Sequence, residues 1–172
     1  MAISTKNLTL IPHVPAVLLA LLQSSDAYQK ISRMSVADGV RQFVVAASSN
    51  FHVELQAATS PDPWRFGFAI VHTAENIVIG MCGFTGPPTP DGAVEIAYSI
   101  APGYEGKGYA TEAAAALIDY ACKNGRVRTI RADTLPQTSA STRVLEKCGF
   151  KKAGEIVDPE NNLIWRWERS AE

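Results

Sequence analysis

This chain has almost no net charge, few cysteines and no long apolar run. Its 172 residues carry 16 basic and 17 acidic side chains, which leaves a formal net charge of −1. So small a net charge argues against a broad electrostatic surface for nucleic acid or for an anionic membrane. No run of about 18 uninterrupted apolar residues occurs either, so we expect no membrane-spanning segment.

Three cysteines and three histidines are present, and neither set has the spacing of metal ligands. Cys82, Cys122 and Cys148 are odd in number and far apart. They give no disulfide framework and favour buried, reduced thiols in a cytoplasmic protein. The histidines lie at positions 13, 52 and 72, too far apart in sequence to indicate a metal site.

The apolar segment 8–22 has the composition of the hydrophobic region of a signal peptide. Pro12 and Pro15 interrupt it, however, and residues 23–26 would make a poor cleavage site. A first strand followed by a core-facing helix fits these residues better. Because the chain has no repeat or long linker and 47% of its residues are hydrophobic, we expect one domain over residues 1–172.

Residue periodicity predicts a mixed order of strands and helices. Helical spacing predicts helices at 15–22, 36–47 (capped by Ser35), 108–123 and 139–148, and a short helix after Asn50. Alternation predicts strands at 5–11, 64–71, 77–84, 93–100, 127–132, 150–157 and 163–168. This order indicates the fold class α/β, with a mixed, largely antiparallel central sheet flanked by helices.

The turn that joins the strand at 93–100 to the helix at 108–123 is rich in glycine. Gly103, Gly106 and Gly108 punctuate it, and the helix begins at once. Glycines let main-chain N–H groups approach an anion closely, and a helix N-terminus adds the positive end of its dipole. The segment therefore predicts a phosphate site.

Two common phosphate motifs do not fit this turn. A dinucleotide fingerprint would need a third glycine where Thr111 stands. A P-loop would need lysine followed by serine or threonine where Tyr109 and Ala110 stand.

Two other motifs carry a resemblance to the GNAT N-acetyltransferase superfamily. Residues 98–112, YSIAPGYEGKGYATE, resemble its acetyl-CoA signature Q/R-x-x-G-x-G/A, with Gly108 and Ala110 in the last two fixed positions. Residues 141–150, STRVLEKCGF, resemble its closing helix. The likeness covers residues 64–167 and is strongest to the branch that acetylates ribosomal-protein N-termini at alanine or serine.

The resemblance implies that acetyl-CoA is the co-substrate, and the spacing of the histidines and cysteines already gave no reason to expect a metal. Main-chain groups of Ser99 and Ile100 would pair with the pantetheine amides, and an N–H there would polarise the acetyl carbonyl. Glu105 replaces the usual glutamine or arginine and should point away from the anion, and Thr138 replaces an asparagine that usually contacts pantetheine. The residues expected to bind the cofactor are Tyr98, Ser99, Ile100, Glu105, Gly106, Lys107, Gly108, Tyr109, Ala110 and Thr111.

Glu95 and Ser141 are the candidate catalytic residues. Glu95 shares a strand face with Ala97 and Ser99, whose small side chains leave space for an amine that must lose a proton before attack. The alternative is a glutamate on a solvated face. Because no tyrosine follows Tyr120, Ser141 is the candidate to protonate the departing thiolate. The alternative is a first-turn serine that hydrogen-bonds the backbone.

The predicted function is an acetyl-CoA-dependent N-acetyltransferase in which a primary amine attacks directly within a ternary complex. Cys148 is expected in the core, not as a nucleophile. Two alternatives stay open: a non-catalytic acyl-CoA binding or sensing module, and an ATP-binding protein. The acceptor, a protein N-terminus or a small molecule, is expected at segments 15–61 and 87–90 and at the last hairpin. No nucleic-acid or membrane partner is expected, and apolar positions near the last strand would permit a homodimer.

Overall fold

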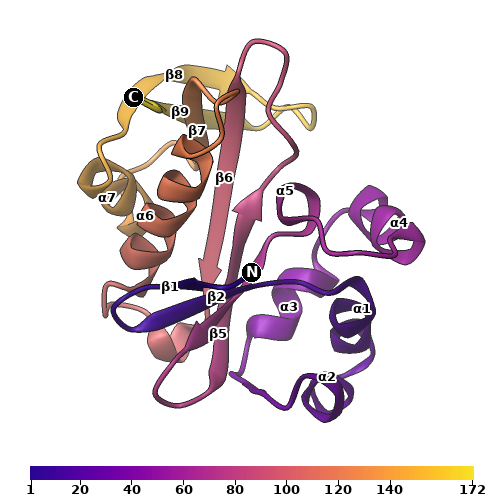
Figure 1. Cartoon of the computed structure of the whole chain (residues 1–172). Coiled ribbons are helices and arrows are strands. Elements are labelled where there is room, and N and C mark those ends of the chain that lie inside the picture. Colours follow the sequence, from indigo (N-terminus) through magenta and orange to yellow (C-terminus); the bar gives the residue numbers. More distant parts are fainter.

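A nine-stranded sheet forms the centre of the computed structural model, which describes residues 1–172 (Figure 1). The strands are β1 (Ile3–Ser4), β2 (Leu8–Pro12), β3 (Ser35–Val36), β4 (Phe68–His72), β5 (Ile77–Phe84), β6 (Ala93–Ile100), β7 (Thr129–Thr134), β8 (Lys151–Val157) and β9 (Leu163–Ser170). Their order is β1-β2-β4-β5-β6-β7-β9-β8, with β3 beside β5. Only the β6–β7 and β3–β5 pairs are parallel. The predicted fold class, mixed α/β with a largely antiparallel sheet, is confirmed.

Helices cover both faces of this sheet (Figure 1). They are α1 (Pro15–Gln23), α2 (Ser25–Ser32), α3 (Val40–Val45), α4 (Ser49–Ala57), α5 (Pro63–Phe66), α6 (Tyr109–Cys122) and α7 (Ala140–Lys147), with a 3₁₀ turn at Pro102–Tyr104. In Figure 1, α6 and α7 lie on one side of β5 and β6, and α1 to α4 lie on the other. None of these helices combines the length and apolar character needed to cross a membrane.

Two hydrophobic clusters fix these layers to the sheet. Strand β4 shows the alternation clearly: Phe68 and Ile70 belong to the cluster under α6, whereas Ala69 and Val71 belong to the cluster under α1, α3 and α4. In α6 the buried residues are Ala113, Ala114, Ala116, Leu117, Ile118 and Ala121. Residues 110, 113, 114, 117, 118 and 121 have the helical spacing that predicts one apolar face, and all of them are buried except Ala110, which is half-buried.

The segment predicted as a strand from residue 64 begins with a helical turn instead. Trp64 and Phe66 lie in α5, and β4 starts only at Phe68. The Asp62 carboxylate accepts a hydrogen bond from the Trp64 N–H at 3.1 Å, and Pro63 occupies the first helical position. These start signals outweigh the alternation of apolar residues, and Gly67, with φ of 68°, ends the turn.

The N-terminal half differs from the prediction in two further places. Ser35 does not cap a helix; it lies in β3, and α3 begins only after Gly39, whose φ is 95°. The helix α2 was not predicted at all. Its cap is Ser24, whose hydroxyl accepts a hydrogen bond from the Ala27 N–H at 3.0 Å. Short helices of this kind are set by their caps, and residue periodicity is weak over so few residues.

The parallel pair at the centre of the sheet separates part of the way along. Strand β6 pairs with β7 only through Ala93–Glu95, whereas 96–100 pair only with β5 on the other side. Beyond Glu95, β7 continues beside β9. The two central strands therefore diverge next to Glu95, and this divergence places the candidate site.

Candidate active site

Three cavities meet where β6 and β7 diverge. The loop cavity, of about 780 Å³, lies between the turn that precedes α6 and the start of α7. The helix cavity, of about 460 Å³, lies between α3 to α5 and strands β5 and β6. The strand cavity, of about 160 Å³, lies between β6 and β7. Tyr98 lines all three, so a molecule in one cavity can approach a molecule in another at this residue.

The loop cavity gathers nearly all of the residues expected to bind a cofactor. Lys107 is the exception: its Nζ lies 5.7 Å from the centre of the Tyr104 ring and the residue does not line the cavity. Glu105 lines the cavity, but its side chain is exposed and has no protein partner. The remaining expected residues that line it are Tyr98, Ser99, Ile100, Gly106, Gly108, Tyr109, Ala110 and Thr111.

Main-chain amides form one wall of this cavity. The six consecutive N–H groups of 106–111 donate to no protein acceptor, and the helical hydrogen bonds begin with the Glu112 N–H, which donates to the Gly108 carbonyl at 3.0 Å. Gly106 and Gly108 have φ of 75° and 84°, a region that side-chain-bearing residues rarely adopt. A cradle of free amides at the positive end of a helix is suited to bind a phosphate.

Two basic residues of α7, Arg143 and Lys147, also line the loop cavity, and they were not among the predicted site residues. They are four residues apart on a helix, so they share a face with Val144. Their i, i+4 spacing could have indicated from the sequence that both cations share one face of a helix. It does not indicate which part of the fold that face contacts. Their charge adds a second source of attraction for an anion in this cavity.

The start of α6 is fixed from both sides. On one side, the Tyr109 hydroxyl lies 3.1 Å from His72 Nε2 in a hydrogen bond to the end of β4. On the other, the Glu112 carboxylate accepts hydrogen bonds from the Asn7 N–H at 2.9 Å and from the Thr5 hydroxyl. Partial burial acts to raise the pKa of Glu112, but these hydrogen bonds hold it below its usual value. The amide cradle is therefore attached to β4 and to the β1–β2 turn.

Main-chain groups of β6 face the divergence at alternate residues. The Glu95 carbonyl accepts from Thr85 and the Ala101 N–H donates to Ile79, so odd-numbered residues bond toward β5. Tyr98 and Ile100 consequently direct their N–H and C=O groups to the open side. The expectation for Ile100 fits this geometry. The expectation that main-chain groups of Ser99 pair with pantetheine does not fit, because strand alternation directs the N–H and C=O of Ser99 toward β5.

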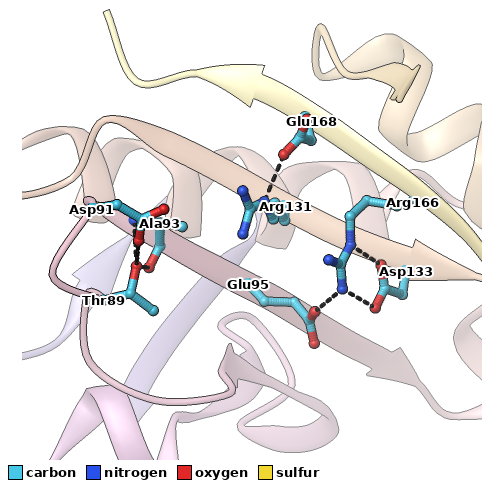
Figure 2. A network of polar contacts seen from close by, with 8 residues as sticks. All are labelled: Thr89, Asp91, Ala93, Glu95, Arg131, Asp133, Arg166 and Glu168. Carbon is cyan, nitrogen blue, oxygen red and sulfur yellow. Dashed lines mark hydrogen bonds and ion pairs between the residues drawn. The ribbon is translucent and has the colours of Figure 1, made fainter. Parts of the chain in front are cut away.

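Glu95 lies in a cluster of charges at the divergence. Figure 2 shows Glu95, Asp133 and Arg166 directed toward one another from β6, β7 and β9. Glu95 Oε1 is 3.6 Å from Arg166 Nη2, and the guanidinium donates two hydrogen bonds of 3.1 Å to Asp133. Neither Asp133 nor Arg166 was singled out from the sequence, because β7 and β9 bring them together only in the fold.

The surroundings of Glu95 favour its protonated form. Burial raises the pKa of Glu95 to about 7, and the negative charge of Asp133 acts in the same direction, whereas Arg166 and Arg131 act to lower it. Arg131 is itself paired with Glu168 at 2.6 Å (Figure 2). A carboxyl group that titrates near neutral pH is suited to accept and release a proton under ordinary conditions.

Ser141 lies in the first turn of α7 and lines both the loop cavity and the strand cavity. It is exposed, and its carbonyl accepts a hydrogen bond from the Tyr98 hydroxyl at 3.3 Å. The helix cap is Ser139, whose hydroxyl accepts from the Thr142 N–H. The Ser141 hydroxyl thus has no capping role. Cys148 lies in the hydrophobic core as predicted, and burial raises the pKa of its thiol.

Comparison with known proteins gives consistent matches. Residues 8–151 match the family described as "Acetyltransferase (GNAT) domain". The chain is similar to the "Uncharacterized N-acetyltransferase p20" of Bacillus licheniformis, with 35% identity over 96 residues, which cover 56% of this chain and 53% of that protein. The matches span about half the length of the curated relatives.

Solved structures share the fold over nearly the whole chain. An acetyltransferase (GNAT family) from Bacillus anthracis superimposes with a TM-score of 0.64 and 23% identity, covering 99% of both chains. The ribosomal L7/L12 α-N-protein acetyltransferase RimL, in complex with coenzyme A, superimposes with a TM-score of 0.66 and 17% identity, covering 99% of this chain and 98% of that one. With the match over residues 8–151, the chain belongs to the GNAT acetyltransferase domain family.

Proposed function

We propose that this protein is an N-acetyltransferase that moves an acetyl group from acetyl-CoA to a primary amine. The observation that carries the proposal is the row of free amides at 106–111 in the wall of the loop cavity. That cavity meets the strand cavity, which Glu95 lines, at Tyr98. The proposal therefore assigns phosphate binding to the loop cavity and proton acceptance to the strand cavity, and Tyr98 lines both. The residues fit coenzyme A by their chemistry, because amides and two cations suit its phosphates and free strand groups suit its amide-containing arm.

Each part of the site has a defined task in this proposal. The amides of 106–111 bind the diphosphate, and Arg143 and Lys147 add charge to the phosphate end. Main-chain groups of Tyr98 and Ile100 orient the pantetheine arm as an added strand would. Holding the thioester and the amine together at the divergence supplies the proximity that a bimolecular reaction otherwise lacks.

Acetyl-CoA supplies the thioester carbonyl carbon, to which the amine nitrogen bonds as the carbon–sulfur bond breaks. Glu95 removes one proton from the ammonium so that the nitrogen lone pair becomes available. The Ser141 hydroxyl or a water beside it delivers a proton to the thiolate, and the second nitrogen proton, which leaves as the amide forms, replaces it on that hydroxyl or water. The products are an N-acetylamine, the free coenzyme A thiol and the proton held by Glu95, which passes to solvent.

The acceptor in this proposal is a protein N-terminus or a small amine. The first is suggested by the fold shared with RimL, whose name gives a ribosomal protein as its acceptor. We place the reaction in the cytoplasm, which agrees with three free cysteines. A homodimer is compatible with exposed apolar residues on the last hairpin, Val157 and Leu163.

The proposal is tested by release of the coenzyme A thiol in the presence of an amine library. We expect thiol release that requires both acetyl-CoA and an amine, with no acetylated enzyme side chain on mass spectrometry of the reacting protein. Coenzyme A should raise the melting temperature, and ATP should not. Binding of coenzyme A without amine-dependent thiol release would instead identify a sensing module, and stabilisation by ATP alone would identify a nucleotide site.

A further inference from the structure

Half of the residues that line the helix cavity are hydrophobic, and three of them are phenylalanines from the neighbouring helices. Phe43, Phe51 and Phe66 come from α3, α4 and α5, and the rings of Phe51 and Phe66 meet edge to face with centroids 5.9 Å apart. Phe43 and Phe51 are only half-buried, so part of each ring is free to contact another molecule. The cavity reaches β6 at Ala97 to Ser99, beside the divergence that holds Glu95.

Charged groups in the lining of this cavity are few. Glu54 and Arg65 are the charged side chains of the lining, and they lie 3.9 Å apart. Arg65 is shared with Asp62, which lies outside the lining at 3.3 Å, so one cation faces two carboxylates. His13 lines the cavity as well, but burial lowers its pKa to about 4, so that it is neutral at pH 7. The lining itself thus offers apolar contact area without net negative charge.

We propose that the acceptor is a primary amine with a single positive charge next to one aromatic or branched apolar group. This inference rests on the proposed N-acetyltransferase function and names its acceptor class. The apolar group would pack against Phe43, Phe51 and Phe66, and the amine would lie toward Ala97 and the Glu95 carboxylate.

Charge explains why polyamines are excluded. The reacting ammonium loses its proton to Glu95, so it reacts as a neutral amine that a lining without net charge can hold. A polyamine brings two or more further ammonium groups out of water, whereas the lining offers a single carboxylate, Glu54, which already lies beside Arg65. A site for polyamines would need several acidic side chains in place of the phenylalanine rings.

The test compares three probes at equal acetyl-CoA concentration: 2-phenylethylamine, the peptide amide Phe-Ala-Ala-NH₂, and spermidine. We expect kcat/KM for at least one of the first two to exceed that for spermidine by about tenfold or more, as burial of one aromatic group allows. The first two arms distinguish a free amine from a peptide N-terminus, and preference for either supports the proposal. Preference for spermidine overturns it while leaving the acetyltransferase function standing. No thiol release with any amine overturns the proposed function itself.

A matched pair of variants tests the charge argument. Asn50 is exposed and lines the cavity, so Asn50→Asp adds one carboxylate with almost no change in shape. We expect the preference for 2-phenylethylamine over spermidine to fall by about two- to fivefold, the scale of an exposed ion pair. Asn124→Asp adds the same charge at the end of α6, outside the three cavities, and should leave the preference unchanged. An unchanged preference in Asn50→Asp would contradict the proposal.

Discussion

Glu95 owes its suitability as a base to the residues around it. Its position on β6 buries the carboxyl group, and Asp133 adds a negative charge from the neighbouring strand. Arg166 limits the effect, because it pairs with both carboxylates. The result is a pKa of about 7, between that of an exposed glutamate and that of a buried one without a cation.

Glu95→Gln is expected to lower kcat by about a hundred- to ten-thousandfold, the usual contribution of a general base, with little change in KM for acetyl-CoA. The wild-type rate should rise with pH through about 7, since only the carboxylate accepts a proton, and the variant should lose this rise. Glu146→Gln, the same change at an exposed position of α7 that lines none of the three cavities, is the control. A pH–rate profile that is the same in Glu95→Gln and wild type would remove Glu95 from the mechanism.

The same substitution has a consequence for stability, with a sign fixed by the raised pKa. Folding favours the protonated form of Glu95, so its contribution to the free energy of unfolding is present at low pH and is lost as pH rises through about 7. Glutamine stays neutral at every pH. Urea titrations at pH 8 should therefore find Glu95→Gln at least as stable as the wild type, although it is far less active.

Sequence reasoning reached some residues of the site and missed others for a definite reason. The face of Glu95 follows from strand alternation, which is local, and the glycines of 103–108 carry their own conformational signal. Asp133 and Arg166 depend on the register between β7 and β9, where they lie directly opposite one another. That register is a tertiary property, and no pattern within either strand specifies it.

At the scale of elements, the turn and α6 act as one unit. The turn supplies free amides, the helix supplies the dipole, and hydrogen bonds from Tyr109 and Glu112 attach the unit to its neighbours. Long periodic elements such as α6 and β5 were predictable because their pattern extends over many residues. The short α5 and β3 were not, since a cap at Asp62 and pairing with β5 decided them.

Gly108→Ala is expected to weaken acetyl-CoA binding through the backbone. A Cβ at this position would meet no atom within 4 Å, so the φ of 84° is the only cause of strain. The free energy of unfolding should fall by about 1 kcal/mol, and KM for acetyl-CoA should rise while KM for the amine stays unchanged. Gly103→Ala is the matched control, because its Cβ also meets open space and its φ is not positive. An unchanged KM for acetyl-CoA would contradict a role for the turn in phosphate binding.

At the scale of the whole molecule, the sheet separates two cores and the site lies where it opens. One core is shared with α6 and the other with α1, α3 and α4, so each layer can be recognised by its own cluster. His13 directly follows β2, and its main-chain N–H donates a hydrogen bond to the Gly67 carbonyl at 3.1 Å. Only 5% of it is exposed, and its Nε2 has no hydrogen-bond partner. A protonated imidazole would be poorly accommodated there.

The stability of the fold should therefore depend on pH through His13. Burial lowers its pKa from 6.5 to about 4, so the unfolded chain takes up a proton before the folded chain does. The contribution of His13 to the free energy of unfolding is complete above pH 6.5, and it decreases by about 3 kcal/mol as the pH falls through 4. Glu95 acts with the opposite sign between pH 7 and 4.5, so the difference between His13→Gln and wild type reports His13 alone. Urea titrations between pH 7 and 4 should show this difference shrinking toward low pH. A difference that stays constant over this range would show that His13 is not the group that titrates.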